Sequence, residues 1–414
     1  PLMFLTLAVL NPAVLVWGTT VRGYGLASVT IVFAFAAAAK FVTQRTKRDA
    51  VLMAIAFVAA VQCLVSNTAL VFAISLGAMS VCWWRGERRS ALIVAGALGV
   101  AALSYLPYVA TYSKTNWHVV LQTNVSAGAL WSAFCESLGA HNPATALAWI
   151  FFVLLASMCA FRNAHPPGLS VYASLVVVFA VLGIGIFLRL LSYIPQQWYF
   201  VPLVSVLAIA LDLAVCATEL SPIVRLLRLL VCVVAVALSC WSGWPMLTAR
   251  QTNVDLVANW LDQHAHNNDL VVVNPWFAGV SFNRYYHGVA PWITVPMMKD
   301  KSIHRYDLLQ NKMSESDPLA DIKSTIENTL RNGGRVYLVG GAHFLEKNDQ
   351  PLVLPPAPNS QYGWSLLPYI VAWSQQIADL VQAHARTAAA VPPLSDHVNF
   401  EEDVPLWQVE GWSD

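Results

Sequence analysis

The sequence predicts a polytopic α-helical membrane protein of about nine spans, followed by a C-terminal extracytoplasmic α/β domain. Apolar residues make up 57% of the 414 residues and charged residues only 11%, whereas about 25% of an ordinary soluble domain is charged. Charge is also divided unequally. Residues 1–249 hold 13 Lys and Arg against 5 Asp and Glu, and residues 250–414 hold 11 against 18. We therefore expect a basic transmembrane domain over 1–248 and an acidic soluble domain over 249–414.

Nine apolar runs account for the predicted spans. Each approaches the roughly 20 residues that a helix needs to cross a bilayer, and they lie near 1–17, 24–41, 50–65, 68–84, 90–108, 144–161, 169–190, 197–217 and 229–247. Only "SNT" separates the third run from the fourth, so a re-entrant pair is an alternative there. All seven cysteines precede residue 250 and six lie in apolar runs. Such cysteines are usually buried apolar residues, so neither disulfides nor a metal site is expected.

Basic loops predict the orientation, because short loops rich in Lys and Arg stay in the cytoplasm. Four such clusters occur at every second boundary between runs: "KFVTQRTKRD", "WWRGERRS", "FRNAHPPG" and "SPIVRLLR". This parity places the loop of residues 109–143, the "SYIPQQWY" turn and the chain after residue 248 on the outer side. Asp212, a carboxylate well inside a run, then lies nearer the cytoplasm, where we expect it to pair with Arg225 or Arg228.

After residue 248 the long apolar runs end, and the pattern of apolar residues becomes that of short helices and strands. Apolar residues recur at helical spacing from Val254, "DLVVVNP" indicates a buried strand, and a helix that Asp317 caps precedes the strand "RVYLV". A further helix fits 365–386, and "PLWQVEGW" fits a last strand. This order predicts a small α/β layer domain. Asn274, at the carboxyl end of the first strand, could contact an acceptor molecule, although a helix start would explain the same residues.

Arg22 and Tyr24 stand at the mouth of the second apolar run. The planar guanidinium of arginine suits a phosphate or pyrophosphate head group at a membrane interface, and tyrosine is an amphipathic anchor beside it. The simpler interpretation is that both residues only set the height of the helix in the bilayer.

The arrangement "NPAVLVWG" followed by "VRGYGLA" resembles the C-type membrane glycosyltransferases, the superfamily of the protein O-mannosyltransferases and the bacterial lipid A aminoarabinose transferases. In these proteins a helix ends outside near an Asn-Pro or Ser-Pro, and an "R-x-Y-x-L" opens the next span. Asn11, Pro12, Arg22, Tyr24 and Leu26 follow that order. The outer loop midway and the outer α/β domain agree in layout, so the resemblance covers nearly the whole chain.

The resemblance implies transfer of a sugar from a polyprenyl-phosphate donor to an acceptor glycan, lipid or protein, on the outer face of the bacterial cytoplasmic (inner) membrane. Donor-phosphate binding would then fall to Arg22, Tyr24 and Arg189. The loop residues that would contact donor or acceptor are Lys114, His118, Glu136, Gln197 and Tyr199. Membrane lipid is the expected surrounding partner. No cofactor beyond the lipid-linked substrate, no metal and no nucleic-acid partner is expected.

Two departures from the family bear on catalysis. Family members carry an acidic residue in the first outer loop, and this chain is expected to start after that loop, so the catalytic residue is unassigned. Gln197 stands where many members have an arginine before the tyrosine, and Arg189 lies about two turns earlier. Two other functions stay open: a non-catalytic scaffold or sensor with an outer binding domain, and a transporter, which usually needs more polar residues inside its spans.

Overall fold

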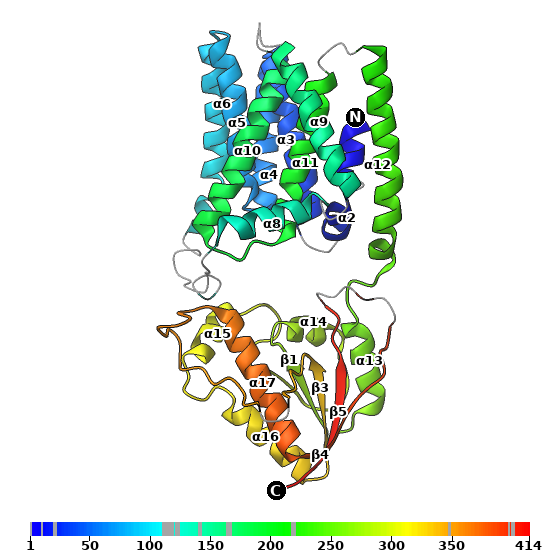
Figure 1. Ribbon diagram of the computed structural model, residues 1–414. Helices are drawn as coiled ribbons and strands as arrows, with labels where there is room; N and C mark the ends of the chain where they lie inside the picture. The colour runs from blue at the N-terminus through cyan, green and yellow to red at the C-terminus, as the bar shows by residue number, and fades with distance from the viewer. Residues whose placement is uncertain are drawn as a thin grey trace. The chain divides into compact units, whose positions relative to one another are not determined.

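The computed structural model describes residues 2–9, 11–19, 23–109, 120, 125–139, 143–162, 168–216, 221–346, 349–395, 398 and 402–414. The chain forms two compact units (Figure 1). The helical unit comprises residues 1–114 and 124–247, and the sheet unit comprises residues 115–123 and 248–414.

In the described part of the helical unit, six helices are long and apolar enough to cross a membrane, which makes the chain a membrane protein. They are Tyr24–Gln44 (α3), Asn67–Trp84 (α5), Arg88–Val109 (with α6 over Arg88–Leu103), Leu169–Leu191 (α10), Gln197–Cys216 (the 3₁₀ turn η3, Gln197–Phe200, with α11, Val201–Cys216) and the first part of α12, Pro222–Thr248. Further helices of this unit are α4 (Lys47–Cys63), α8 (Ala127–Ser137) and α9 (Pro143–Arg162).

The first apolar run does not form one continuous helix. Its described parts are a short turn, α1 (Leu2–Phe4), a π-helix, η1 (Leu5–Val9), and α2 (Pro12–Thr19). Proline has no amide hydrogen and disfavours helical geometry in the residue before it, so a helix restarts here more readily than it continues. The side-chain Oδ1 of Asn11 accepts the amide hydrogens of Ala13 (2.8 Å) and Val14 (3.3 Å), which caps α2.

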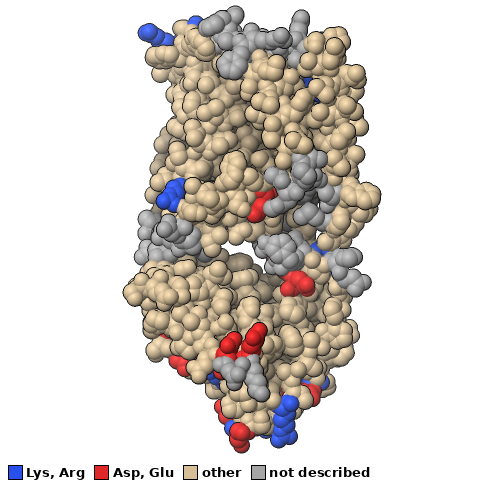
Figure 2. Space-filling view, viewed as in Figure 1, with Lys and Arg blue, Asp and Glu red and all other residues tan. Residues whose placement is uncertain are grey.

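A bundle core holds the long helices together, with α3, α5, α10 and α11 packed against one another. Polar side chains tie helices at buried points. Asn67 donates to the carbonyls of Ala27 (3.1 Å) and Ala60 (3.0 Å), and the Tyr172 hydroxyl donates to the Phe35 carbonyl (3.1 Å). Many outward side chains are large and apolar, and on the face in Figure 2 a broad band of the described surface of this unit is uncharged. Such a surface suits contact with lipid.

Two of the basic clusters lie at one end of the helical unit. Arg45 pairs with Glu87 at 2.6 Å, and Arg85 donates to the Val42 carbonyl at 3.0 Å. These contacts join the turn between α3 and α4 to the turn between α5 and α6. The expected pairing of Asp212 with Arg228 is confirmed, at 3.0 Å between Oδ1 and Nη2.

The sheet unit contains a five-stranded sheet in the order β2-β1-β3-β5-β4. The strands are β1 (Leu270–Asn274), β2 (Trp292–Thr294), β3 (Arg335–Gly340), β4 (Ala385–Ala390) and β5 (Leu406–Trp412). β2, β1 and β3 are parallel, whereas β5 runs antiparallel to both β3 and β4. The carboxyl ends of β1 and β3 therefore meet at one edge, where Asn274 pairs with Gly340.

Helices cover both faces of this sheet (Figure 1). One face bears α15 (Tyr306–Met313), α16 (Ala320–Arg331) and α17 (Leu366–His384), and the other bears α13 (Val254–His264) and α14 (Ala278–Tyr285). Successive side chains of a strand point to opposite faces, so Val272 joins the first core and Val273 the second. Val120 also belongs to the first core.

The regular elements that the sequence predicts in this unit are present, and the structure adds the strands β2 and β4 and the helices α14 and α15. The helix expected over 365–386 ends at His384, and β4 follows it directly. The "ARTAAA" of β4 lacks the β-branched apolar residues by which a strand is usually identified. β2 is too short, at three residues, to show a period.

Candidate functional site

Four aromatic side chains gather at one end of the helical unit, where α2, the start of α3 and η3 meet. We call Trp17, Tyr24, Trp198 and Tyr199 the aromatic cluster. Trp17 and Trp198 have ring centroids 4.5 Å apart, and Trp198 and Tyr199 5.9 Å apart. Tyr24 is 9% exposed and packs into the same small core. The cluster joins two segments that are far apart in the sequence.

Gly25 allows α2 and α3 to approach so closely. A Cβ on Gly25 would collide with the carbonyl group of Gly18, so the two backbones are in direct contact. Only residues without a side chain permit this approach. Gly25 follows Tyr24, and Gly18 follows Trp17, so the glycine contact positions the two aromatic residues of α2 and α3 side by side.

Helix α8 packs against η3 beside this cluster, and Figure 1 shows α8 and α2 at the same end of the helical unit. The Ser126 side chain accepts the amide hydrogen of Ala129 (3.1 Å) and so caps α8. Phe134 of α8 contacts Phe200 of η3, with ring centroids 5.6 Å apart. Trp131 lies beside Phe134 on α8, with ring centroids 5.9 Å apart, and is 66% exposed, which suits an interfacial helix.

Glu136 lies in the last turn of α8. Among the described residues, it is the carboxylate at this end of the helical unit. Its Oε1 accepts a hydrogen bond from the Ser132 hydroxyl at 3.2 Å, and its side chain is partly exposed. Among the described residues it forms no ion pair. The other described carboxylates of this unit lie elsewhere: Asp49 and Glu87 lie with the basic turns, and Asp212 pairs with Arg228.

The structure brings together some of the residues that the sequence singles out. Tyr24 and Tyr199 share the small core around the cluster, and Gln197 begins η3 with its side chain partly buried. Arg189 lies exposed in the last turn of α10, and its carbonyl accepts from the Ser192 hydroxyl at 3.3 Å. Arg22, Lys114 and His118 lie outside the described residues.

Sequence reasoning missed two parts of this site. Trp17 falls within the first apolar run, where the sequence predicts only a span, and its contact with η3 is a finding of the structure. Residues 109–143 are expected to form an outer loop, whereas Ala127–Ser137 form α8 behind Ser126, a good N-cap residue. Nothing in these short segments predicts that Trp17 and α8 both pack against η3, which only the structure shows.

The arrangement suits an amphiphilic ligand. Trp and Tyr rings favour the membrane interface, where one side of a ligand is apolar and the other is hydrated. A partly exposed carboxylate without a cation partner can accept a proton from a nearby hydroxyl. No known protein family and no curated protein sequence matches this chain. What the site binds is therefore inferred from its own chemistry.

Proposed function

We propose that the chain is an integral membrane glycosyltransferase, which moves a sugar from a polyprenyl-phosphate donor to an acceptor glycan, lipid or protein on the outer face of the bacterial cytoplasmic membrane. The observation that carries the proposal is the meeting of the aromatic cluster with the Glu136-bearing helix α8. An aromatic wall for the lipid-linked sugar then lies beside the helix that carries this carboxylate.

The ends of α3 support the proposed orientation. The helix begins at Tyr24 in the aromatic cluster and ends at Gln44, beside the turns that hold Arg45 and Arg85. Basic turns favour the cytoplasm, so the cluster is proposed to lie on the outer side. If α4, α9 and the N-terminal segment 2–19 also cross, the spans number nine: six candidate helices plus three. The sheet unit, which follows α12, is then extracytoplasmic.

The proposed reaction is a displacement at the anomeric carbon of the donor sugar. The acceptor oxygen forms a bond to that carbon while the bond from the carbon to the phosphate oxygen breaks. Polyprenyl phosphate leaves with the electron pair, and Glu136 takes the proton of the acceptor hydroxyl. Arg22, two residues before Tyr24, is proposed to hold the phosphate through paired hydrogen bonds, which also stabilise the leaving group.

The test separates donor binding from transfer in the full chain, reconstituted in nanodiscs with polyprenyl-phosphate sugars. We expect Arg22→Ala to weaken donor binding by about tenfold or more, because a charge-assisted contact to phosphate is lost. Glu136→Gln should leave donor binding intact and lower the transfer rate by about 100-fold or more. Arg225→Ala, an exposed arginine of α12, is the matched control and should behave like the wild type.

Each outcome is decisive. Unchanged donor affinity in Arg22→Ala removes the phosphate role of Arg22. Full transfer by Glu136→Gln moves the base to another residue. Donor binding by the wild type without transfer to any acceptor supports the non-catalytic scaffold or sensor.

A further inference from the structure

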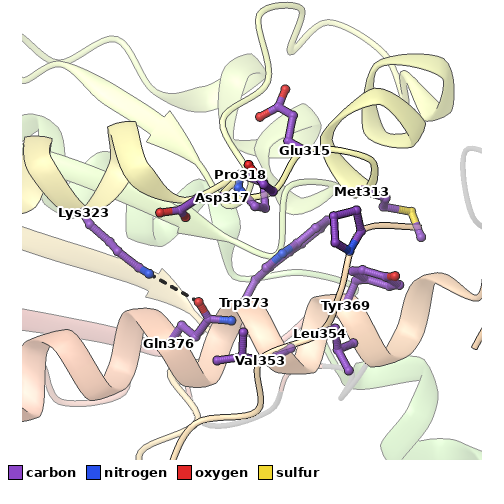
Figure 3. Close-up of a pocket in the computed structure, with 13 residues that line it drawn as sticks. Met313, Glu315, Asp317, Pro318, Lys323, Val353, Leu354, Tyr369, Trp373 and Gln376 are labelled. Carbon is purple, nitrogen blue, oxygen red and sulfur yellow. Dashed lines mark hydrogen bonds between the residues drawn. The ribbon is translucent and has the colours of Figure 1, made fainter. Parts of the chain in front are cut away.

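The sheet unit contains a cavity of about 250 Å³ between the start of α16, the middle of α17 and the segment 353–356 (Figure 3). We call it the α16–α17 pocket. It lies outside the helical unit and shares no residue with the aromatic cluster. Its lining combines charged, amide and apolar side chains, of which six matter here: Asp317, Lys323, Val353, Leu354, Trp373 and Gln376.

Lys323 provides a cation on the pocket wall. Its ammonium donates one long hydrogen bond, 3.3 Å, to the neutral Oε1 of Gln376 (Figure 3). Among the described residues no carboxylate lies within ion-pair distance of it. An ammonium has three hydrogens to donate, so two remain for a ligand. Gln376 is itself held in place, because its Nε2 donates to the Leu352 carbonyl at 3.1 Å.

Asp317 provides an anion on the same wall. One carboxylate oxygen accepts the Leu319 amide hydrogen at 3.3 Å, and the described residues offer this carboxylate no cation. Glu315, the other acid at the pocket, pairs with Lys312 at 2.8 Å. The pocket therefore presents one uncompensated negative and one uncompensated positive group, and its net charge is close to zero.

The opposite wall is apolar and rigid. Trp373 is only 3% exposed and is packed into the core of the sheet unit. The Tyr369 hydroxyl donates to the Pro355 carbonyl at 2.8 Å and accepts from Asn359, and burial raises the pKa of this phenol. Tyr369 therefore stays neutral and fixes the segment that carries Leu354. The pocket is formed before any ligand arrives, as small-molecule sites usually are.

We propose that the α16–α17 pocket binds one monosaccharide ring of a neutral glycan. A sugar ring has an apolar C–H face and a rim of hydroxyl groups, and each hydroxyl both donates and accepts. Asp317 would accept from the rim, and Lys323 would donate to it. Leu354 and Val353 would lie against the C–H face.

Other ligand classes fit less well. A wholly apolar ligand would bury the two charged groups without partners, which costs free energy. A strong anion would be repelled by Asp317, and a strong cation by Lys323. The volume, below the roughly 300 Å³ at which drug-sized sites begin, favours a single ring. This site is independent of the transfer reaction proposed above, since it needs neither donor nor base.

The test is saturation-transfer NMR on the full chain in nanodiscs, with the methyl glycosides of glucose, mannose, galactose and N-acetylglucosamine as probes. We expect saturation transfer to the ring C–H hydrogens of at least one probe. Lys323→Met and Asp317→Asn should each weaken that binding by about tenfold, because each removes a charged hydrogen-bonding group. Lys299→Met and Asp321→Asn, exposed residues outside the lining, are the controls and should retain it.

Two further variants keep the result interpretable. Val353 is 71% exposed at the pocket rim, so Val353→Trp should block the mouth without disturbing the core, and it should abolish binding. Arg22→Ala should leave glycoside binding unchanged, which separates this site from the donor site. No signal above empty nanodiscs from any probe overturns the proposal. So does a signal that survives in Lys323→Met, Asp317→Asn and Val353→Trp alike.

Discussion

At the residue scale, the contact between Asp212 and Arg228 joins α11 to α12. Both side chains are mostly buried, and the Cys216 thiol lies 3.7 Å from each of them. Most of the apolar side chains of α12 face outward, among them Ile223, which is 79% exposed. With so little packing against the other described helices, α12 depends strongly on this ion pair for its position.

We expect replacing one partner of this pair to lower the stability more than replacing both. Asp212→Asn leaves a mostly buried guanidinium without its carboxylate, which costs about 3 kcal/mol of stability, whereas replacing both partners costs less. The thermal unfolding midpoint in nanodiscs should therefore fall in Asp212→Asn and recover in part in the double variant Asp212→Asn, Arg228→Gln. Arg225→Met, at an exposed position one turn away, should change nothing. A midpoint equal to the wild type in Asp212→Asn would show that the pair does not anchor α12.

Single residues also mark the limit of sequence reasoning. An acid inside an apolar run predicts a basic partner, and Arg228 was one of two candidates that the spacing allowed. Tyr24 could be placed at the interface from its position before an apolar run. Its packing with Val201 and the aromatic residues of η3 could not be predicted, because the intervening chain contains no signal for how its helices associate.

At the element scale, the crossing of α2 and α3 controls the geometry of the candidate site. Gly25 against Gly18 brings Trp17 and Tyr24 together, so a side chain at position 25 must push the helices apart.

We expect Gly25→Ala to cost about 1–3 kcal/mol through overpacking and to weaken donor binding as well, because the aromatic cluster opens. Gly96→Ala is the matched control. Gly96 lies in α6 with open space where a Cβ would stand, and alanine favours a helix by about 1 kcal/mol over glycine. Thermal unfolding and donor binding of the two variants, measured side by side, check both effects. Equal behaviour of the two would mean that the crossing has no role in binding.

Elements with a strong period were predictable, and elements that depend on neighbours were not. Strand β1 is a run of apolar residues, and α16 has an apolar stripe of Ile322, Ile326 and Leu330, so both are evident from the sequence. β4 is alanine-rich and pairs only with β5. Such an edge strand is stabilised by its partner, and it cannot be predicted from its own residues.

At the scale of the whole molecule, the proposed orientation makes a prediction about access from the two sides of the membrane. In a variant whose seven cysteines are replaced by alanine, Ser302→Cys in the sheet unit should react with a membrane-impermeant maleimide added to intact cells. Lys47→Cys, in the turn between α3 and α4, should react only after the membrane is permeabilised. The reverse pattern would invert the orientation, and labelling of both in intact cells would contradict the parity of the proposed spans.

The sequence by itself determined the membrane class, the positions of the long helices and the boundary near residue 248, because hydropathy, helical period and charge are properties of neighbouring residues. Tertiary structure alone decided which distant segments meet. It brought Trp17 to Trp198 and α8 to η3, and it assembled the α16–α17 pocket from Asp317, Lys323 and Gln376. Those contacts depend on how helices pack, and packing is set by side-chain shape across the whole core. A periodic pattern along the chain does not reveal it.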